Sequence, residues 1–238
     1  MIQRETLEWT DGTISMRGTL LRDDDLQGPA PGILIAPAYA GTGPVEEERA
    51  EFLARAGYVV LLGDYYGEGK RAADAEEATA LMFAVEGQRP VLAKRMTAAL
   101  AALAAQDCVD ETRLGAMGYC YGGKAVLDLA RSGADLAVVG SLHGVLDPPP
   151  QPTQAIKASV LVMHGWDDPL AEPEAVVALA QELTRAGAEW QLLGFGQTGH
   201  SFTNPRANSP ESGMAHSAAA TQRAYAALDR LFAEKLGR

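Results

Sequence analysis

One short stretch in the middle of the chain, residues 113–130 (RLGAMGYCYGGKAVLDLA), constrains the fold more than any other. An apolar segment typical of a buried strand leads through GYCYGG at residues 118–123 directly into a helical pattern. Gly118 and Gly122 stand two residues to either side of Cys120, where Cβ atoms would collide if the cysteine occupied a sharp strand-to-helix turn. The pattern is typical of a nucleophile elbow, with sulfur in place of the usual oxygen.

Two plainer interpretations of this stretch remain open at this point. Glycine-rich turns between a strand and a helix also bind phosphates, and a cysteine is often an inert core residue. The glycine spacing argues against nucleotide binding, because it fits neither the dinucleotide pattern nor the phosphate loop. Residues further along the chain must therefore decide the role of Cys120.

Apolar runs alternate with amphipathic segments along the whole chain. A hairpin is predicted around the turn at residues 11–13, with strands at 7–10 and 14–22. Buried strands are predicted at residues 31–37, 58–64, 113–119, 136–143, 158–165 and 188–195, and helices at 46–57, 74–88, 91–106, from the elbow to Gly133, 173–187 and 214–236. This alternation predicts an α/β fold with a mostly parallel central sheet of about eight strands and helices on both faces. No linker interrupts it, so residues 1–238 are predicted to form a single domain.

Charge and composition limit the partners of the chain. The formal net charge of −11 and the sequence pI near 4.8 disfavour nucleic acid and anionic membrane surfaces, so a small-molecule substrate is expected. No signal peptide and no run of eighteen apolar residues is visible, which predicts a cytoplasmic protein. Cys108 and Cys120 form neither a disulfide framework nor a metal-binding spacing. The oligomeric state, monomer or homodimer, stays open.

A nucleophilic cysteine needs a base and a carboxylate that orients the base, and both follow in the sequence. Asp168 comes after the strand that ends at Gly165, and His200 comes after the last predicted strand. The order nucleophile, acid, histidine is that of hydrolases with a nucleophile elbow. Both loops leave the carboxyl ends of strands, the same edge on which Cys120 is predicted. Asp168 is favoured over Asp167 because the following proline stiffens its turn.

The other histidines fit the role of base less well. His143 and His164 precede the acid in the sequence and lie at strand ends, so packing or supporting roles are expected for them. His216 falls within the predicted last helix and is expected to be exposed.

An oxyanion formed during acyl transfer needs backbone donors beside the nucleophile. The N–H of Tyr121, directly after Cys120, and the N–H of Tyr39, in the loop that begins at Ala38, are the candidates. Further substrate contacts are predicted for Ala38, Tyr65, Lys70, Arg71, Trp166 and Phe202. The alternatives are core packing for the aromatic residues and simple solvation for the two basic ones.

With these motifs in place, the chain resembles the dienelactone hydrolase family of α/β-hydrolases. The resemblance rests on GYCYGG at 118–123, HGWDD at 164–168 and GHSF at 199–202, and it extends over essentially the whole chain. It implies a catalytic triad of Cys120, Asp168 and His200, hydrolysis of small esters or lactones, and neither a metal nor an organic cofactor.

Two positions depart from the family pattern. Family members that open dienelactones carry a Gln-Glu pair where this chain has Pro37 and Ala38. They also carry an arginine four residues after the histidine, where this chain has Asn204, and Arg206 two residues later is the candidate replacement. The resemblance therefore implies a broader esterase or lactonase rather than a dienelactone hydrolase in the strict sense.

The sequence thus predicts a hydrolase of small carboxylic esters or lactones that works through a thioester on Cys120. Two alternatives remain. The same triad could pass the acyl group to an alcohol or amine, or the fold could serve as a small-molecule-binding or thiol-sensing module whose cysteine is oxidised reversibly.

Overall fold

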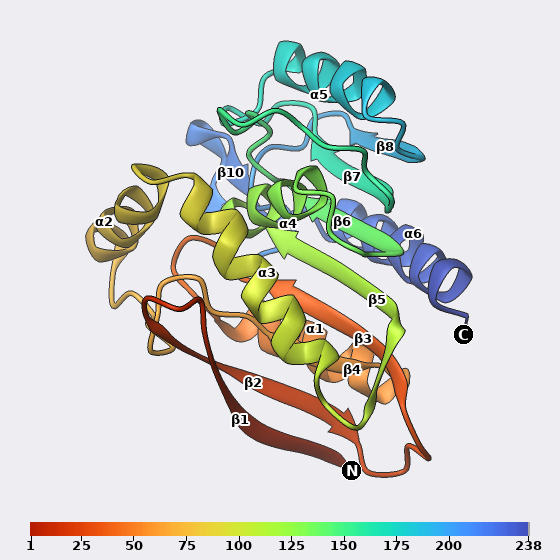
Figure 1. Ribbon diagram of the computed structural model, residues 1–238. Helices are drawn as coiled ribbons and strands as arrows, with labels where there is room; N and C mark the ends of the chain where they lie inside the picture. Colours follow the sequence, from red (N-terminus) through yellow and green to blue (C-terminus); the bar gives the residue numbers. More distant parts are fainter. Residues whose placement is uncertain (238) are drawn as a thin grey trace. The chain divides into compact units, whose positions relative to one another are not determined.

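The computed structural model describes residues 1–237, which form two compact units that divide between Ala116 and Met117. Within the described residues, eight strands make one sheet in the order β1-β2-β4-β3-β5-β6-β7-β8 (Figure 1). Strand β5 (Val109–Tyr119) runs through the boundary between the units. The pairs β3–β4, β6–β7 and β7–β8 are parallel, and antiparallel pairing is found for β1–β2 and β2–β4. The predicted mostly parallel sheet of about eight strands is confirmed.

The N-terminal unit begins with the predicted hairpin. Strands β1 (Ile2–Thr10) and β2 (Ser15–Asp23) pair antiparallel over their full length. The turn between them is held by Asp11, whose carboxylate accepts hydrogen bonds from the backbone N–H groups of Thr13 and Ile14. Strands β3 (Ala30–Ala36) and β4 (Val59–Leu62) are completely buried, as expected for parallel strands covered on both faces.

Helices α1 (Pro44–Arg55) and α3 (Pro90–Ala104) cover the sheet of the N-terminal unit, and α2 (Ala75–Glu86) contacts α3. Helix α3 lies in front of the strands in Figure 1, and α1 lies behind them. Helix α2 begins at Asp74, whose side chain accepts a hydrogen bond from the N–H of Glu77 at 2.9 Å. Pro90 occupies the first turn of α3, where its missing N–H costs no hydrogen bond, and this confirms the predicted break between the two helices.

The C-terminal unit continues from the end of β5 into α4 (Tyr121–Arg131). Strands β6 (Val138–Leu142) and β7 (Ser159–Gly165) are fully buried, and β8 (Trp190–Phe195) is the partly exposed edge strand. Helix α4 lies in front of β6 and α6 (Ala218–Leu236) behind it in Figure 1, while α5 (Pro173–Arg185) contacts β8.

Three predicted boundaries are wrong by four residues or more. Strand β1 begins at Ile2, five residues before the predicted start at residue 7. Strand β5 begins at Val109, four residues before the predicted start. The closing helix begins at Ala218 rather than at 214, because Met214–Ala215 forms strand β10, which pairs with β9 (Asn208–Ser209) after a short 3₁₀ turn at Pro210–Ser212. Ser217 then caps the helix by accepting a hydrogen bond from the N–H of Ala220. His216 is exposed as predicted, but it lies just before the helix and not within it.

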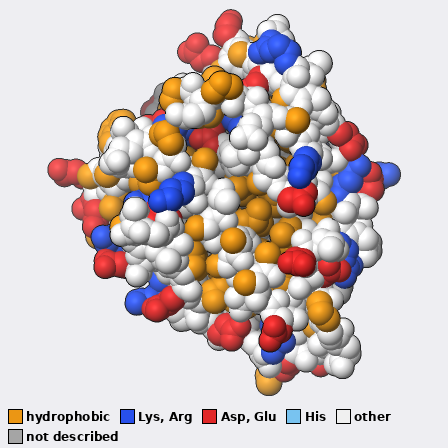
Figure 2. All heavy atoms as spheres, viewed as in Figure 1, with side chains coloured by type: hydrophobic (Ala, Val, Ile, Leu, Met, Phe, Trp, Pro, Cys, Tyr) orange, Lys and Arg blue, Asp and Glu red, His pale blue; other side chains and the backbone are white. Residues whose placement is uncertain are grey.

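Three further observations concern the cysteines, the helices and one face of the surface. Both cysteines are free thiols. In the described part of the chain, no helix has the length and apolar character that crossing a bilayer requires. On the face shown in Figure 2, acidic and basic side chains are interspersed and do not gather into a patch of one sign.

Candidate active site

The backbone at Cys120 has the strained geometry of a nucleophile elbow. Its φ of 52° and ψ of −115° lie in a region that residues with a side chain rarely adopt. A Cβ atom on Gly118 would lie 2.1 Å from the carbonyl oxygen of Gly122, so only glycine fits there. The N–H of Cys120 donates to the carbonyl of Leu142 at 3.1 Å, and its carbonyl accepts from the N–H of Lys124 at 3.2 Å. Strand β6 and helix α4 therefore hold the turn from both sides.

Asp168 and His200 meet as the sequence predicts. The Nδ1 atom of His200 lies 2.8 Å from Oδ2 of Asp168, and both residues are at most 2% exposed. The second carboxylate oxygen, Oδ1, accepts a hydrogen bond from the N–H of Leu170 at 2.8 Å. Asp168 is thus fixed by its own turn and can hold Nδ1 of His200 in the protonated tautomer, which leaves Nε2 as the reactive nitrogen.

The loop that carries His200 is fixed by a close backbone approach. The N–H of His200 donates to the carbonyl of Gly213 at 2.7 Å. A Cβ atom on Gly199 would lie 2.0 Å from that same oxygen, so a glycine is required before the histidine. The short strand β10, absent from the sequence-based prediction, therefore helps to position the histidine, since His200 also bridges to Met214.

The charge state of His200 follows from its neighbours. Burial disfavours the imidazolium and lowers the pKa of His200, but hydrogen bonding with Asp168 and Cys120 and the charges of these two groups outweigh burial and raise the pKa to about 10. The Nε2 atom is buried and has no partner with full hydrogen-bond geometry within residues 1–237. The thiol of Cys120 thus raises the pKa of the ring, but among the described residues it makes no hydrogen bond of full geometry with Nε2.

His143 packs directly against the histidine of the pair. The two rings meet edge to face with centroids 5.1 Å apart, and Nε2 of His143 lies 2.7 Å from Oγ1 of Thr203. Complete burial and the charge of His200 hold the pKa of His143 well below its ordinary value, so this ring is neutral. His164 is also buried and contacts the ring of Trp166. Both histidines have the supporting positions that the sequence indicated.

The first predicted oxyanion donor lies at the start of a helix. Tyr121 is the first helical residue of α4, and N–H groups in the first turn of a helix have no partner within the helix. Tyr121 therefore begins the helix directly after the cysteine, at the positive end of the helix dipole.

The second predicted donor, Tyr39, belongs to the N-terminal unit, in a loop that is fixed from several sides. The Tyr66 hydroxyl donates to the carbonyl of Tyr39 at 2.7 Å, and the Tyr65 hydroxyl contacts the carbonyls of Pro37 and Ala38 at 2.6 and 2.9 Å. Tyr65 is completely buried, so its side chain supports this loop and is not an exposed wall.

Sequence reasoning missed Glu46, which holds the same loop. Its carboxylate accepts hydrogen bonds from the N–H groups of Ala38 and Gly43, both at 3.0 Å. Burial raises the pKa of Glu46, in spite of these bonds and of the positive charge of Arg71. Because the N–H of Ala38 is occupied, it is not available as an oxyanion donor. A glutamate three residues after Gly43 is a capping-box pattern that could have revealed this role.

The remaining predicted substrate contacts differ in exposure. Phe202 is completely buried against His143 and Phe195, so it packs in the core of the C-terminal unit. Trp166 is 45% exposed and could contact a ligand. Arg206 is exposed, and so are Lys70 and Arg71 in the N-terminal unit.

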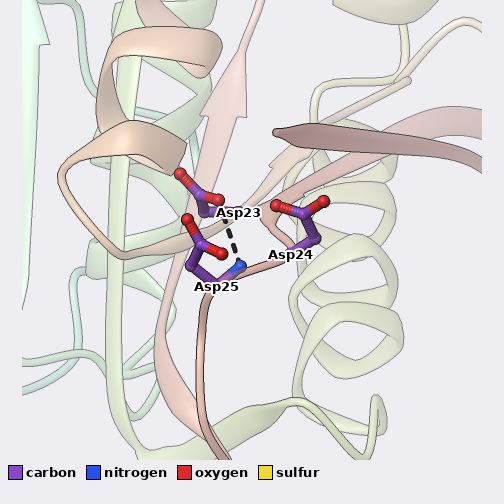
Figure 3. A group of neighbouring side chains, drawn as sticks. All are labelled: Asp23, Asp24 and Asp25. Carbon is purple, nitrogen blue, oxygen red and sulfur yellow. Dashed lines mark hydrogen bonds between the residues drawn. The ribbon is translucent and has the colours of Figure 1, made fainter.

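One group of acidic side chains in the described residues brings three carboxylates close enough to share a cation. Asp23, Asp24 and Asp25 lie together at the end of β2 (Figure 3). The amino group of Met1 pairs with Asp23 and Asp24, and the N–H of Asp25 donates to Asp23 at 3.2 Å. None of the predicted triad residues belongs to this group. The expectation of a reaction without metal or organic cofactor stays a prediction.

Comparison with known families agrees with this geometry. The sequence profile of the dienelactone hydrolase family matches residues 16–236. Among curated proteins, the chain is 36% identical to the uncharacterized protein K02A2.1 of Caenorhabditis elegans over 140 residues, covering 57% of this chain and 89% of that protein. It is 28% identical to a probable 2-oxo-3-(5-oxofuran-2-ylidene)propanoate lactonase of Bradyrhizobium sp over 210 residues, covering 82% and 84% of the two chains.

Solved structures show the same fold. The dienelactone hydrolase-like promiscuous phosphotriesterase P91, from metagenomic libraries, superposes with a TM-score of 0.93 at 36% identity and 98% coverage of both chains. The protein m3DLH gives a TM-score of 0.93 at 35% identity, with 99% of both chains covered. A dienelactone hydrolase from Anabaena variabilis, at 20% identity and a TM-score of 0.72, covers 99% of both chains and shares the fold.

Proposed function

The chain belongs to the dienelactone hydrolase family, has the α/β-hydrolase fold and is a carboxylic ester hydrolase, and from this premise we propose that it cleaves small esters or lactones through Cys120. His200 serves as the base, and Asp168 orients it. The observation that carries the proposal is the 2.8 Å contact between Nδ1 of His200 and Asp168, beside a cysteine with elbow geometry.

The first half of the reaction forms a thioester. The raised pKa of His200 favours an imidazolium next to a Cys120 thiolate. The thiolate sulfur attacks the carbonyl carbon, and the electron pair of the C=O bond moves onto oxygen. When this oxyanion collapses, the C–O bond to the leaving group breaks, and the His200 imidazolium protonates the departing oxygen.

The second half releases the acid. The neutral imidazole of His200 now takes a proton from water, and the hydroxide attacks the thioester carbonyl. Collapse of this second intermediate breaks the C–S bond and returns the thiolate of Cys120. Asp168 stabilises the imidazolium in both halves because its carboxylate stays ionised and accepts a hydrogen bond from Nδ1–H.

Backbone N–H groups stabilise the oxyanion in both steps. We assign this role to Tyr121 on the basis of its place at the start of α4, and Tyr39 stays the second donor predicted from the sequence. Loss of one such donor typically lowers the rate by about 10²–10³.

The substrate range should be broader than dienelactones. Pro37 and Ala38 replace the Gln-Glu pair, and Asn204 replaces the substrate-binding arginine of family members that open dienelactones. We therefore expect neutral esters and lactones to be accepted, because the groups that those family members use for dienelactones are replaced here.

A panel of esters and lactones of graded acyl length and charge tests the proposal. Wild type should hydrolyse neutral p-nitrophenyl esters and small lactones, and Cys120→Ala and His200→Gln should lose nearly all of this activity. Adding methanol separates hydrolysis from acyl transfer, because a transferase would form the methyl ester as its main product. Unchanged turnover by Cys120→Ala would end the proposal and favour a binding or sensing role for the fold.

A second activity is favoured by the 36% identity to the phosphotriesterase P91 over 98% of the chain. The same thiolate could attack phosphorus in a phosphotriester and displace a phenolate, after which water activated by His200 would break the P–S bond. Paraoxon added to the panel tests this. Release of p-nitrophenol by wild type and not by Cys120→Ala is the expected result if the chain shares the activity.

A further inference from the structure

The N-terminal unit contains a cavity of about 320 Å³ that none of the proposed triad residues lines. Its walls come from the hairpin β1–β2, the loop after β3, the first turn of α1 and the loop after β4. Its size lies at the lower end of the range of small-molecule sites, which is about 300–1,000 Å³.

Most charged groups on these walls already have partners within the protein. The Asp64 carboxylate accepts hydrogen bonds from four backbone N–H groups, those of Arg17, Tyr66, Gly67 and Gly69, at 2.8–3.0 Å. Arg17 pairs with Glu8 at 3.0 Å, and Lys70 pairs with Glu68 at 3.5 Å. These groups shape the cavity, but they offer a ligand little uncompensated charge.

Arg71 is the exception among the basic wall residues. Within residues 1–237, no carboxylate lies within ion-pair distance of its guanidinium, although its charge acts on the buried Glu46. The backbone of Arg71 packs closely against the loop after β3. A Cβ atom on Gly41 would lie 3.2 Å from the Cα of Arg71, and the N–H of the next residue, Ala72, donates to the carbonyl of Ala40 at 3.0 Å. A guanidinium without an ion-pair partner among the described residues matches a carboxylate, which it can bind through two parallel hydrogen bonds.

The other available wall groups are hydroxyls and one carboxylate. Thr6 and Thr19 are direct cross-strand partners, so their side chains lie side by side on one face of the hairpin. Glu47, in the first turn of α1, has no ion-pair partner in the described part of the chain. A ligand that suits this set has an anionic group for Arg71 and a hydroxyl group that can donate to Glu47 and exchange hydrogen bonds with a threonine.

We propose that this cavity binds a small hydroxycarboxylate, with the ligand carboxylate on Arg71 and the ligand hydroxyl at Glu47. Opening a lactone yields a hydroxycarboxylate, so the ligand belongs to the chemical class of the reaction product; this link, though not the binding site itself, rests on the function proposed above.

Calorimetric titration of the full-length protein with 4-hydroxybutyrate tests the proposal. Wild type and Cys120→Ala should bind it with the same affinity. Arg71→Gln should weaken binding by about tenfold or more, the effect expected when a charged hydrogen-bonded partner is lost. Lys70→Gln is the matched control: it removes the same charge from the neighbouring residue, and because Lys70 is already paired, the change should stay within about threefold.

Two further ligands separate the sources of affinity. Butyrate lacks the hydroxyl and should bind more weakly than 4-hydroxybutyrate, and this difference should shrink in Glu47→Ala, which removes the acceptor of the ligand hydroxyl. Inorganic phosphate should compete poorly, because it has no separate hydroxyl arm. Equal affinity for phosphate would mean a general anion site and would overturn the proposal.

Three results would contradict the inference directly. They are no measurable binding by wild type, equal losses in Arg71→Gln and Lys70→Gln, and loss of binding in Cys120→Ala, which would place the ligand at the catalytic cysteine. The outcome is independent of the proposed function. Ester hydrolysis without binding of 4-hydroxybutyrate refutes only the proposed ligand site in the cavity. Binding of 4-hydroxybutyrate without Cys120-dependent ester hydrolysis refutes only the proposed mechanism.

Discussion

At Cys120 a single residue takes up the strain of the turn between β5 and α4. Its positive φ of 52° is uncommon for a residue with a side chain, and such strain persists only where the surrounding structure enforces it. Gly118 permits the turn because its missing Cβ leaves room for the carbonyl of Gly122. The glycine spacing made this turn predictable from the sequence, since the steric requirement is local.

Replacing Gly118 with alanine should damage both folding and activity. The new Cβ would lie 2.1 Å from the Gly122 oxygen, so the turn must move. We expect a loss of about 1–3 kcal/mol in the free energy of unfolding and a large fall in kcat/KM. Gly196→Ala is the control, because a Cβ there meets no atom within 4 Å. Urea unfolding and ester hydrolysis measure both effects, and equal behaviour of the two variants would show that the turn tolerates a side chain.

Changing Asp168 to asparagine should remove the support for the His200 imidazolium. The expected loss in kcat is on the order of 10⁴, as when a serine-protease triad loses its carboxylate. Asp167→Asn is the matched control, since Asp167 is the exposed neighbour. Similar losses in both variants would mean that the sequence-based choice between the two aspartates has no basis.

The pH profile should report the raised pKa of His200. Wild-type kcat/KM should persist into the alkaline range and fall as the pH rises through about 10, where the imidazolium that protonates the leaving group is lost. The same shift stabilises the fold. That contribution is fully present below the ordinary histidine pKa of 6.5 and is lost as the pH rises through about 10. A decline already centred near pH 6.5 would show that Asp168 and Cys120 do not raise the pKa of His200.

Among the elements, local patterns predicted the strands and helices well and non-local pairings poorly. The hairpin, the break at Pro90 and the helix that starts after Cys120 follow from turn, cap and periodicity signals within a few residues. Strand β10 cannot be predicted from such local signals, because its pairing with β9 and its contact with His200 depend on how a loop folds back. The hydrogen bond of Glu46 to Ala38 and the contact of His143 with Thr203 were missed for the same reason, because the partners lie 8 and 60 residues away.

Helix α4 is joined to α5 and to the loop after β6 through Arg131. Its guanidinium donates to Asp128 at 3.0 Å, to both carboxylate oxygens of Glu182 at 2.8 and 2.9 Å, and to the carbonyl of Leu146 at 3.1 Å. Burial alone would raise the pKa of Glu182, but hydrogen bonds from Arg131 and Thr153 lower it. Sequence periodicity places Arg131 on a helix but cannot reveal these partners.

Replacing Arg131 with methionine should therefore be strongly destabilising. Asp128, whose side chain is 1% exposed, would lose its ion pair with Arg131, and breaking a buried pair in this way typically costs about 3–5 kcal/mol. Lys157→Met is the control, because its pair with Asp135 is exposed and should contribute about 0–1 kcal/mol. Urea unfolding compares the two variants, and a loss below about 1 kcal/mol for Arg131→Met would contradict the role of this network.

For the molecule as a whole, the sequence predicts one domain, and the chain is described as two compact units. The boundary between Ala116 and Met117 falls inside strand β5, so independent unfolding of the units would have to break that strand. Such a division inside a continuous strand cannot be seen from the sequence, because no linker marks it. The single-domain prediction itself stays open to experiment.

Unfolding should occur in one cooperative step if the prediction is right. Trp9 reports on the N-terminal unit, and Trp166 and Trp190 report on the C-terminal unit. The urea midpoints of Trp9→Phe and of the double variant Trp166→Phe/Trp190→Phe, followed by fluorescence, should each agree with the midpoint from circular dichroism of the same protein. Two separated transitions would identify two domains.

The most direct measurement is intact-protein mass spectrometry of enzyme quenched in acid during turnover of p-nitrophenyl acetate. A thioester on Cys120 predicts a mass gain of one acetyl group, which peptide mapping places on Cys120. The acetylated fraction, compared with the turnover rate of the same protein, should be larger in His200→Gln than in wild type. The mass gain should be absent in Cys120→Ala. Steady hydrolysis with no acetyl group on Cys120 at any time, or undiminished hydrolysis by Cys120→Ala, would contradict the account.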